Sequence, residues 1–243
     1  MPQWLPAVEL MARAMPQSIL VVAAHPDDEV LGCGGTIARH ADDGDLVQVL
    51  IVAEGATSRQ GKRDRDQAAD ELTNLAQAAQ KASTILGAVE VELMDLPDNR
   101  LDSLNRLDLI KQVETRIARH QPEVVYVHHA GDVNVDHRRL HEAVVTACRP
   151  VPGQTVRQLL SFEVASSTEW QPPGSAPVFH PNWFVDISSH WERKCLALEA
   201  YASEMRPWPH ARSIKSLEHL ARWRGAQIGV EAAEAFCLLR QII

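Results

Sequence analysis

Short apolar runs alternate along the chain with longer segments in which apolar and polar residues mix. The apolar runs predict buried strands, and the mixed segments predict helices with one apolar face. The expected strands are 18–24, 45–53, 89–95, 123–128, 158–164 and 182–187. The expected helices are 34–43, 63–86, 104–120, 137–148, 188–205 and 213–226, with a short tail to Ile243.

This order of elements indicates the fold class. Alternating strands and helices imply parallel strands joined by right-handed crossovers. We therefore expect an α/β fold with a Rossmann-like, mostly parallel sheet, helices on both faces and C-terminal elaborations. The segment 206–212 must be a loop, because its two prolines exclude a helix. No repeat or dividing linker is evident, so residues 1–243 are expected to form a single domain.

Composition limits the possible functions. The chain has 243 residues, of which 45% are hydrophobic, enough for a sizeable core. Its formal charge of −8 argues against a general nucleic-acid binder, which usually presents a basic face. The four cysteines form no Cys-x-x-Cys pair and are expected to be reduced thiols. We expect no secretory leader, no membrane span and a cytoplasmic location.

The first strand runs directly into four ionisable side chains within five residues, in Ala24-His25-Pro26-Asp27-Asp28-Glu29. His and Asp are ordinary zinc ligands, and a further carboxylate beside them can move protons. The alternative is a capped helix start, where acidic residues are also favoured. The glycine-rich segment 31–36 is expected to be a tight turn leading into the helix.

A second cluster of histidine and aspartate follows the strand at 123–128. The segment reads His128-His129-Ala130-Gly131-Asp132-Val133-Asn134-Val135-Asp136-His137-Arg138. Ligands of open α/β sheets bind at the carboxyl ends of strands. The two clusters are therefore expected to meet at one edge of the sheet.

Together these motifs resemble those of the PIG-L/LmbE-like deacetylases, zinc-dependent enzymes that remove N-acyl groups, chiefly acetyl from amino sugars. The similarity lies in 24–29 and 132–138 and continues through 96–101, 166–170 and 222–225. It implies that His25, Asp28 and His137 hold Zn²⁺ and that Asp27 is the general base. Three protein ligands leave a position for water, as catalytic zinc sites do. Glu29 is the rival ligand and is interpreted as a group behind the ligands or a helix-start acid.

One position departs from the family pattern. Many members carry histidine three residues before the last metal ligand, where this chain has Asn134. Asparagine can donate a hydrogen bond but cannot shuttle a proton near neutral pH. We expect Asn134, Arg100 and His129 to bind substrate. The catalytic acid must then come from elsewhere, with His210 as first candidate and His129 as second.

The resemblance implies a metal-dependent hydrolase that removes an N-acetyl group from an amino sugar or sugar conjugate. The alternatives are an amidase of another sugar- or thiol-conjugated amide, and a non-catalytic metal- or sugar-binding module. The expected partner is a small N-acetylated sugar, with no nucleic acid. Trp208 stands between two prolines and suits a subunit contact, so a homo-oligomer is expected. Stacking of Trp170, Trp183 or Trp208 on a sugar ring is an alternative to a core or interface role.

Overall fold

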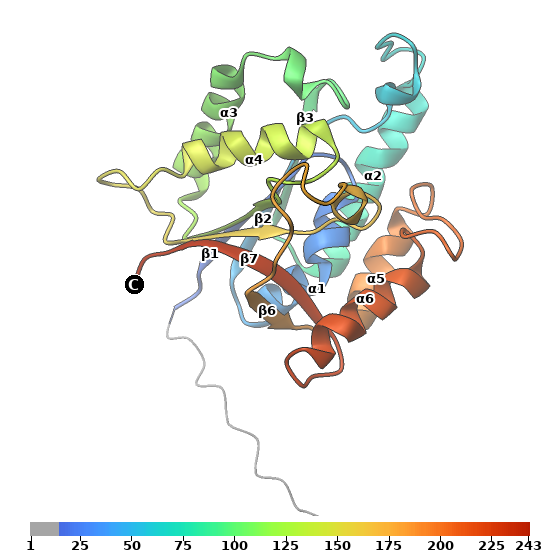
Figure 1. Cartoon of the computed structure of the whole chain (residues 1–243). Helices are drawn as coiled ribbons and strands as arrows, with labels where there is room; N and C mark the ends of the chain where they lie inside the picture. Colours follow the sequence, from blue (N-terminus) through green and yellow to red (C-terminus); the bar gives the residue numbers. More distant parts are fainter. Residues whose placement is uncertain (1–14) are drawn as a thin grey trace, which may run out of the picture.

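Seven strands form one sheet in the computed structural model of the protein, which describes residues 15–243 (Figure 1). The strands are β1 (Ser18–Ala23), β2 (Leu46–Ala53), β3 (Glu90–Leu96), β4 (Val124–His128), β5 (Gln158–Phe162), β6 (Trp183–Asp186) and β7 (Ala233–Gln241). Their order across the sheet is β3-β2-β1-β4-β5-β7-β6. The first five are parallel, and β7 runs antiparallel between β5 and β6.

This order confirms the predicted Rossmann-like α/β fold. The arrangement β3-β2-β1-β4-β5 is that of doubly wound sheets, whose strand order reverses between β1 and β4. Within residues 15–243, no helix is both long and apolar enough to cross a membrane. The expectation of no secretory leader concerns residues 1–14, which lie outside the described part of the chain.

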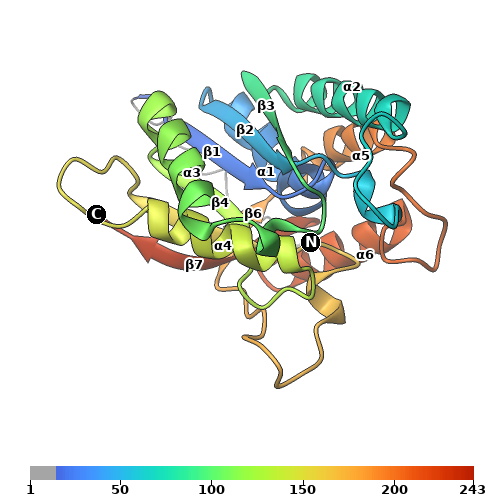
Figure 2. The same ribbon diagram turned by 90° about the horizontal axis from the view of Figure 1, so that it is seen from above.

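Helices cover both faces of the sheet (Figure 2). They are α1 (Asp28–Asp42), α2 (Ala69–Leu86), α3 (Arg106–His120), α4 (Val135–Ala147), α5 (Trp191–Ala200) and α6 (Ile214–Ala226). Ile19 and Val21 of β1 pack with α1, α2, α5 and α6, whereas Leu20 and Val22 pack with α3 and α4. Successive side chains of a strand point to opposite faces. Both faces are buried, which explains the unbroken apolar run of β1.

The predicted tight turn at 31–36 is wrong, because α1 begins at Asp28 and includes the glycines. These glycines permit close packing of the helix. A Cβ on Gly32 would stand 2.4 Å from the Phe162 ring, and one on Gly35 would stand 2.7 Å from Ile187. The close contacts of α1 with Phe162 and Ile187 therefore explain these glycines, and no turn is present in this segment.

Several other element bounds also differ from prediction. The expected C-terminal tail is wrong, because residues 233–241 form β7. This strand is rich in alanine and leucine and has no β-branched residue, so its composition does not favour a strand. Pairing with β5 and β6 on its two sides fixes it. The helices predicted at 63–86 and 188–205 are shorter, spanning Ala69–Leu86 and Trp191–Ala200.

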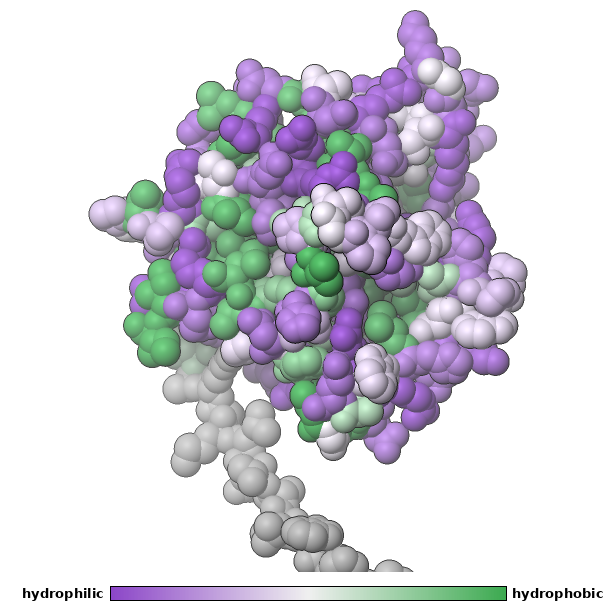
Figure 3. Space-filling view, in the orientation of Figure 1, coloured by the Kyte–Doolittle hydropathy of each residue, from purple (hydrophilic) through white to green (hydrophobic). Residues whose placement is uncertain are grey.

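Hydrophobic surface gathers near the C-terminus on the face shown in Figure 3, at its lower left. Leu239 and Ile243 are among the exposed large apolar residues of this end. Gln241 pairs with Gln158, the first residue of β5, so the chain ends at the edge where the parallel strands begin. This apolar surface therefore lies at the opposite edge of the sheet from the two His/Asp clusters.

A buried ion pair ties α5 and β7 to the middle of α1. Lys194 Nζ donates to Glu234 Oε1 at 2.7 Å and to the Leu31 carbonyl at 2.8 Å. The Glu234 carboxylate also accepts from the backbone N–H groups of Gly35 (2.9 Å) and Thr36 (2.7 Å). The helix that starts at the first His/Asp cluster is thereby fixed from two other elements.

Replacing Lys194 with Met is expected to lower the free energy of unfolding by about 3–5 kcal/mol, because the buried Glu234 carboxylate loses its cation. Urea denaturation followed by circular dichroism measures this loss. Lys111→Met is the matched control: Lys111 is 64% exposed beside Glu114, and such surface pairs contribute about 0–1 kcal/mol. Equal losses in the two variants would contradict a stabilising role for the Lys194–Glu234 pair.

Candidate metal centre and active site

Three ligand atoms from the two His/Asp clusters converge at the carboxyl ends of β1 and β4, and we call them the ligand triangle. Asp28 Oδ2 lies 3.1 Å from His25 Nδ1 and 3.1 Å from His137 Nε2. The two ring nitrogens are 3.4 Å apart. Atoms that bind one zinc tetrahedrally at about 2.1 Å stand about 3.4 Å apart. The triangle therefore has the size that three ligands of one metal require.

A second observation supports a metal here. Asp28 Oδ1 is buried and has no hydrogen-bond partner within residues 15–243. An unpaired buried carboxylate oxygen is costly. The Asp28 side chain is fully buried and that of His137 is 1% exposed, whereas that of His25 is 12% exposed. The residues present thus fit a cation that is reached from the His25 side.

The turn between β1 and α1 sets this geometry. The backbone N–H of His25 donates to Asp28 Oδ2 at 2.9 Å, which fixes the carboxylate beside the ring. Asp27 has a φ of 111°, in a region that residues other than glycine rarely adopt. Its N–H donates to Glu29 Oε2 at 3.1 Å, and the Tyr201 hydroxyl donates to Glu29 Oε1 at 2.6 Å. Glu29 therefore supports the turn from behind, as one of the two sequence interpretations expected.

Each histidine of the triangle directs its other ring nitrogen at a carboxylate. His25 Nε2 lies 3.1 Å from Asp136 Oδ2 and 3.3 Å from Asp98 Oδ1. His137 Nδ1 lies 3.2 Å from Asp132 Oδ1. A proton on these nitrogens leaves His25 Nδ1 and His137 Nε2 with lone pairs facing Asp28. Metal-binding histidines commonly donate their other N–H to such a group.

These outer carboxylates are themselves held by neighbouring loops. Asp136 accepts from the N–H groups of Asn99 (2.7 Å) and Leu101 (2.9 Å). Asp132 accepts from the hydroxyls of Ser167 and Thr168, the latter at 2.6 Å. Sequence reasoning did not assign these groups to the site. They could have been predicted as site residues, because they lie in the segments that carry the family resemblance.

Electrostatics favour a cation within the triangle. Although burial opposes its charge, Asp28 and Asp132 raise the pKa of His137 to about 9. Burial also opposes ionisation of Asp28, yet His137 and His128 hold its pKa well below the usual range. The pKa of Asp132 falls to about 2 despite burial, chiefly through its hydrogen bond with His137. The site therefore concentrates ionised carboxylates around the ring nitrogens.

Asp27 has different partners from Asp28. Arg212 Nη1 donates to Asp27 Oδ2 at 2.5 Å, and Arg212 Nε donates to Ser166 Oγ at 2.7 Å. Burial raises the pKa of Asp27 well above its usual range, and Arg212 opposes this rise. A carboxyl with a raised pKa is suited to accept a proton from water. Arg212 was not predicted, although it lies two residues after His210 in the proline-rich loop.

The two candidate acids have contacts in the surrounding loops. His210 Nδ1 accepts from the Arg212 N–H at 3.0 Å, and its ring lies edge-on to Trp170, with centroids 5.9 Å apart. His129 Nε2 lies 3.0 Å from the Pro177 carbonyl oxygen, and its ring lies edge-on to Phe179. Each histidine ring is thus held by contacts with loop residues.

The two other predicted substrate-binding residues come from neighbouring loops. Asn134 caps α4, since its side chain accepts from the Asp136 N–H at 2.8 Å. Its amide also donates to Asn99 Oδ1 at 3.0 Å. Arg100 follows Asn99 and is half-buried at the start of a short helical turn. This contact brings the loops after β3 and β4 together.

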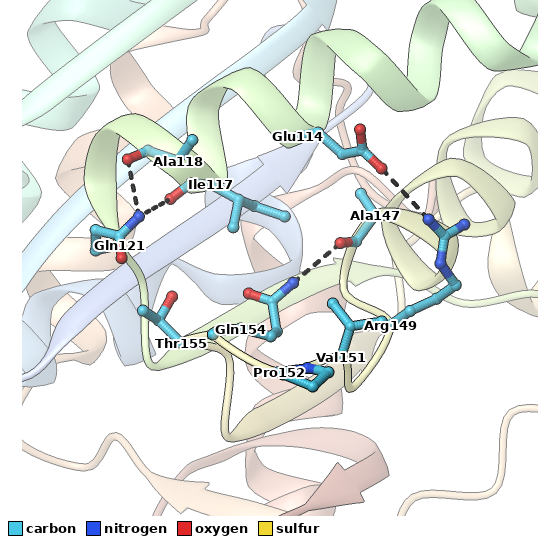
Figure 4. Close-up of a pocket in the computed structure, with 11 residues that line it drawn as sticks. Glu114, Ile117, Ala118, Gln121, Ala147, Arg149, Val151, Pro152, Gln154 and Thr155 are labelled. Carbon is cyan, nitrogen blue, oxygen red and sulfur yellow. Dashed lines mark hydrogen bonds and ion pairs between the residues drawn. The ribbon is translucent and has the colours of Figure 1, made fainter.

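A separate cavity of about 300 Å³ lies between the C-terminal ends of α3 and α4 (Figure 4). Several of its polar groups pair with one another, whereas the buried Thr155 hydroxyl has no hydrogen-bond partner within residues 15–243. Gln154 Nε2 donates to the Ala147 carbonyl at 3.1 Å, and Arg149 lies 3.6 Å from Glu114. The two helices end where the parallel strands begin, so this cavity is on the opposite edge of the sheet from the ligand triangle.

Known proteins resemble this chain in sequence and in fold. The family profile for PIG-L, described as GlcNAc-PI de-N-acetylase, matches residues 20–148. An uncharacterized deacetylase, YaiS, from Escherichia coli is 30% identical over 156 residues, covering 62% of this chain and 76% of that protein. A 4-oxalmesaconate hydratase from Pseudomonas putida is 30% identical over 217 residues, covering 80% and 76%. The crystal structure of the conserved protein TT1542 from Thermus thermophilus has a TM-score of 0.71 at 25% identity, covering 93% and 96%.

Removing either histidine of the triangle is expected to abolish metal binding. His25→Ala and His137→Ala should lose a near-stoichiometric metal measured by elemental analysis after dialysis, because each removes one of three ligands. Asp132→Asn should retain the fold and lower metal affinity by about 10–100-fold, since it weakens the group that orients His137. His120→Ala is the control, because His120 belongs to a separate, half-buried cluster with Glu90 and Glu92 that shares no residue with the triangle. Unchanged metal content in the first two variants would exclude this site.

Proposed function

The chain belongs to the PIG-L family, and on this basis we propose that it is a zinc-dependent hydrolase that removes an N-acetyl group from an amino sugar or sugar conjugate. The observation that carries the proposal is the juxtaposition of the ligand triangle with a separate buried carboxylate, Asp27. A metal-binding module needs the triangle alone. Hydrolysis needs, in addition, a group that takes a proton from water.

His25, Asp28 and His137 would hold the Zn²⁺. Bound zinc supplies a Lewis acid for the acyl carbonyl and lowers the pKa of its water toward about 7. Asp136 and Asp132 keep the ring nitrogens of the two histidines in the tautomers that coordination requires. These carboxylates orient the two rings, and binding of the metal would displace the second proton of His137, whose pKa, despite burial, Asp28 and Asp132 raise to about 9.

Asp27 would take the proton of the attacking water. Its contact with Arg212 occupies Oδ2 and orients the carboxyl group. Burial keeps its proton affinity high, which suits a base that must hold a proton between steps. The Arg212 guanidinium also brings a positive charge beside the reaction centre, where negative charge develops on the carbonyl oxygen.

The leaving amine needs a proton, and His210 is the proposed source. His210 shares its loop with Arg212, which reaches Asp27. His129, or Asp27 acting a second time, is the alternative. Asn134, Arg100 and His129 would contact the sugar from the loops around the triangle. A homo-oligomer and a cytoplasmic location stay predictions.

A hydratase is the second candidate. The Pseudomonas putida relative is a 4-oxalmesaconate hydratase, and the match covers 80% of this chain. The Arg212 cation beside Asp27 would also suit a carboxylate-bearing substrate. Both reactions activate water, so the products must distinguish them.

A panel of N-acetylated sugars, free, nucleotide-linked and lipid-linked, is expected to release acetate with the purified protein. A chelator should abolish the release. Asp27→Asn should retain metal while lowering kcat by about 10²–10⁴-fold, the usual contribution of a positioned base. Asp43→Asn is the control, because Asp43 lies 55% exposed at the other end of α1. Hydration of unsaturated carboxylic acids without acetate release would favour the hydratase, and metal binding without either reaction would favour a binding module.

Loss of His210 should act on protonation of the leaving group. His210→Ala is expected to lower kcat by about 10²–10⁴-fold with unchanged metal content. An acid works only when protonated, so the wild-type rate should fall at high pH, and the variant should lose this alkaline limb. His219→Ala is the control, since His219 packs on Trp208 of the same loop. An unchanged kcat and alkaline limb in His210→Ala would assign the role to His129 or Asp27.

A further inference from the structure

The Arg212 guanidinium faces two carboxylates that compete for it. Its Nη1 atom lies 2.5 Å from Asp27 Oδ2 and 3.9 Å from Glu204 Oε2. The Glu204 side chain is only 8% exposed, so its charge is largely withdrawn from water. A buried carboxylate without a close cation is costly. Glu204 on its own would therefore draw Arg212 away from Asp27.

Arg59 gives Glu204 a nearer cation. Its Nη2 atom donates to the same oxygen, Glu204 Oε2, at 2.7 Å, whereas the Arg212 nitrogen stands 3.9 Å away. The other terminal nitrogen of Arg59 contacts Glu71 of α2. Because Arg59 pairs with Glu204 at hydrogen-bond distance, Arg212 keeps its own short contact for Asp27.

The backbone that carries Arg59 is fixed from the metal side of the site. Arg59 ends a short helical turn, Thr57–Arg59, in the loop after β2. The Ser58 N–H donates to Asp98 Oδ2 at 3.0 Å, and Asp98 Oδ1 lies 3.3 Å from His25 Nε2. The turn is thus tied to a carboxylate that stands behind a proposed metal ligand.

The backbone that carries Glu204 is fixed from the side of the base. The Glu204 N–H donates to the Tyr201 carbonyl at 2.8 Å. Tyr201 is fully buried, and its hydroxyl donates to Glu29 in the turn that also contains Asp27. Both competing carboxylates are therefore held in place. A lost cation at Glu204 would move the long Arg212 side chain and leave the carboxylates where they are.

We propose that Arg59 is a positioning residue for the reaction: by pairing with Glu204, it keeps the Arg212 guanidinium on Asp27. The effect on turnover rests on the proposed function, because that function makes Asp27 the base. A merely structural ion pair would join the loops after β2 and α5 without any effect on Arg212. The two cases differ in what happens when both partners are removed.

The kinetic test removes the partners singly and together, with acetate release from the panel of N-acetylated sugars as the assay. Arg59→Gln should lower kcat by roughly 10- to 100-fold with little change in KM or metal content, because Arg212 turns toward the unpaired Glu204 and no longer orients Asp27. Adding Glu204→Gln removes the competing charge and should restore most of the lost kcat. A structural pair predicts the opposite, that the second substitution adds to the loss.

Two further variants serve as controls. Arg59→Lys keeps a cation at Glu204 and should keep most of the wild-type kcat. Arg222→Gln is the matched control for loss of an arginine ion pair, because Arg222 is 57% exposed and lies 2.9 Å from Glu218 on α6. It should leave kcat unchanged.

A crystal structure of Arg59→Gln separates this proposal from the proposed function. Arg212 Nη1 should lie within about 3.2 Å of Glu204 and no longer contact Asp27. This shift, in a protein whose wild type releases no acetate, would overturn the deacetylase and support the positioning role. Arg212 retained on Asp27 would overturn the positioning role whatever the activity. A double variant no more active than Arg59→Gln would overturn it as well.

Discussion

The buried Asp28 carboxylate is the constraint on which the site depends. Its Oδ2 atom accepts the N–H of His25 and faces the rings of His25 and His137, each at 3.1 Å. Asp28 is also the first residue of α1, so the position of this oxygen is fixed by the packing of the helix on the sheet. Lys194 and Glu234 hold the same helix from α5 and β7. The geometry of the candidate metal centre therefore depends on the close packing of α1 against Phe162 and Ile187, which the glycines of this helix permit.

The pKa values of two adjacent aspartates, Asp27 and Asp28, are shifted in opposite directions by their surroundings. The histidines around Asp28 keep its pKa well below the usual range, whereas burial raises the pKa of Asp27 although Arg212 lies beside it. Where the surroundings of two neighbouring carboxyl groups shift their pKa values in opposite directions, one group commonly stays ionised and the other takes up and releases a proton. The φ of 111° at Asp27 makes this possible, because it turns two consecutive carboxyl groups toward different neighbours. The strained backbone thus supports the proposed division of roles, in which Asp28 binds the metal and Asp27 acts as the base.

The features that can be predicted from the sequence are those that follow from the apolar runs of the strands and from the residues at their ends. The continuous apolar runs of β1 and β4 predict buried parallel strands, and the carboxyl ends of such strands meet, so the sequence alone predicts that His25 and His137 lie together. Prediction failed where long-range contacts decide. Strand β7 owes its conformation to its two neighbours, and the glycines of α1 owe theirs to Phe162 and Ile187. Arg212 reaches Asp27 only because a distant proline-rich loop folds back over the site.

The family profile matches residues 20–148 and leaves the C-terminal part of the chain outside the match. Residues 20–148 contain the whole ligand triangle and the three carboxylates behind its histidines, Asp98, Asp132 and Asp136. Ser166 and Arg212, which bond to each other, lie beyond that span. A deacetylase and a hydratase both resemble this chain, so a shared water-activating core is compatible with more than one reaction. The substrate bond that the activated water attacks must then depend on how the protein binds and orients the substrate. The groups proposed to hold it come from the loops after β3 and β4, which carry Arg100, His129 and Asn134, and from the C-terminal loop that carries Arg212. Substrate choice would then depend on these loops more than on the sheet.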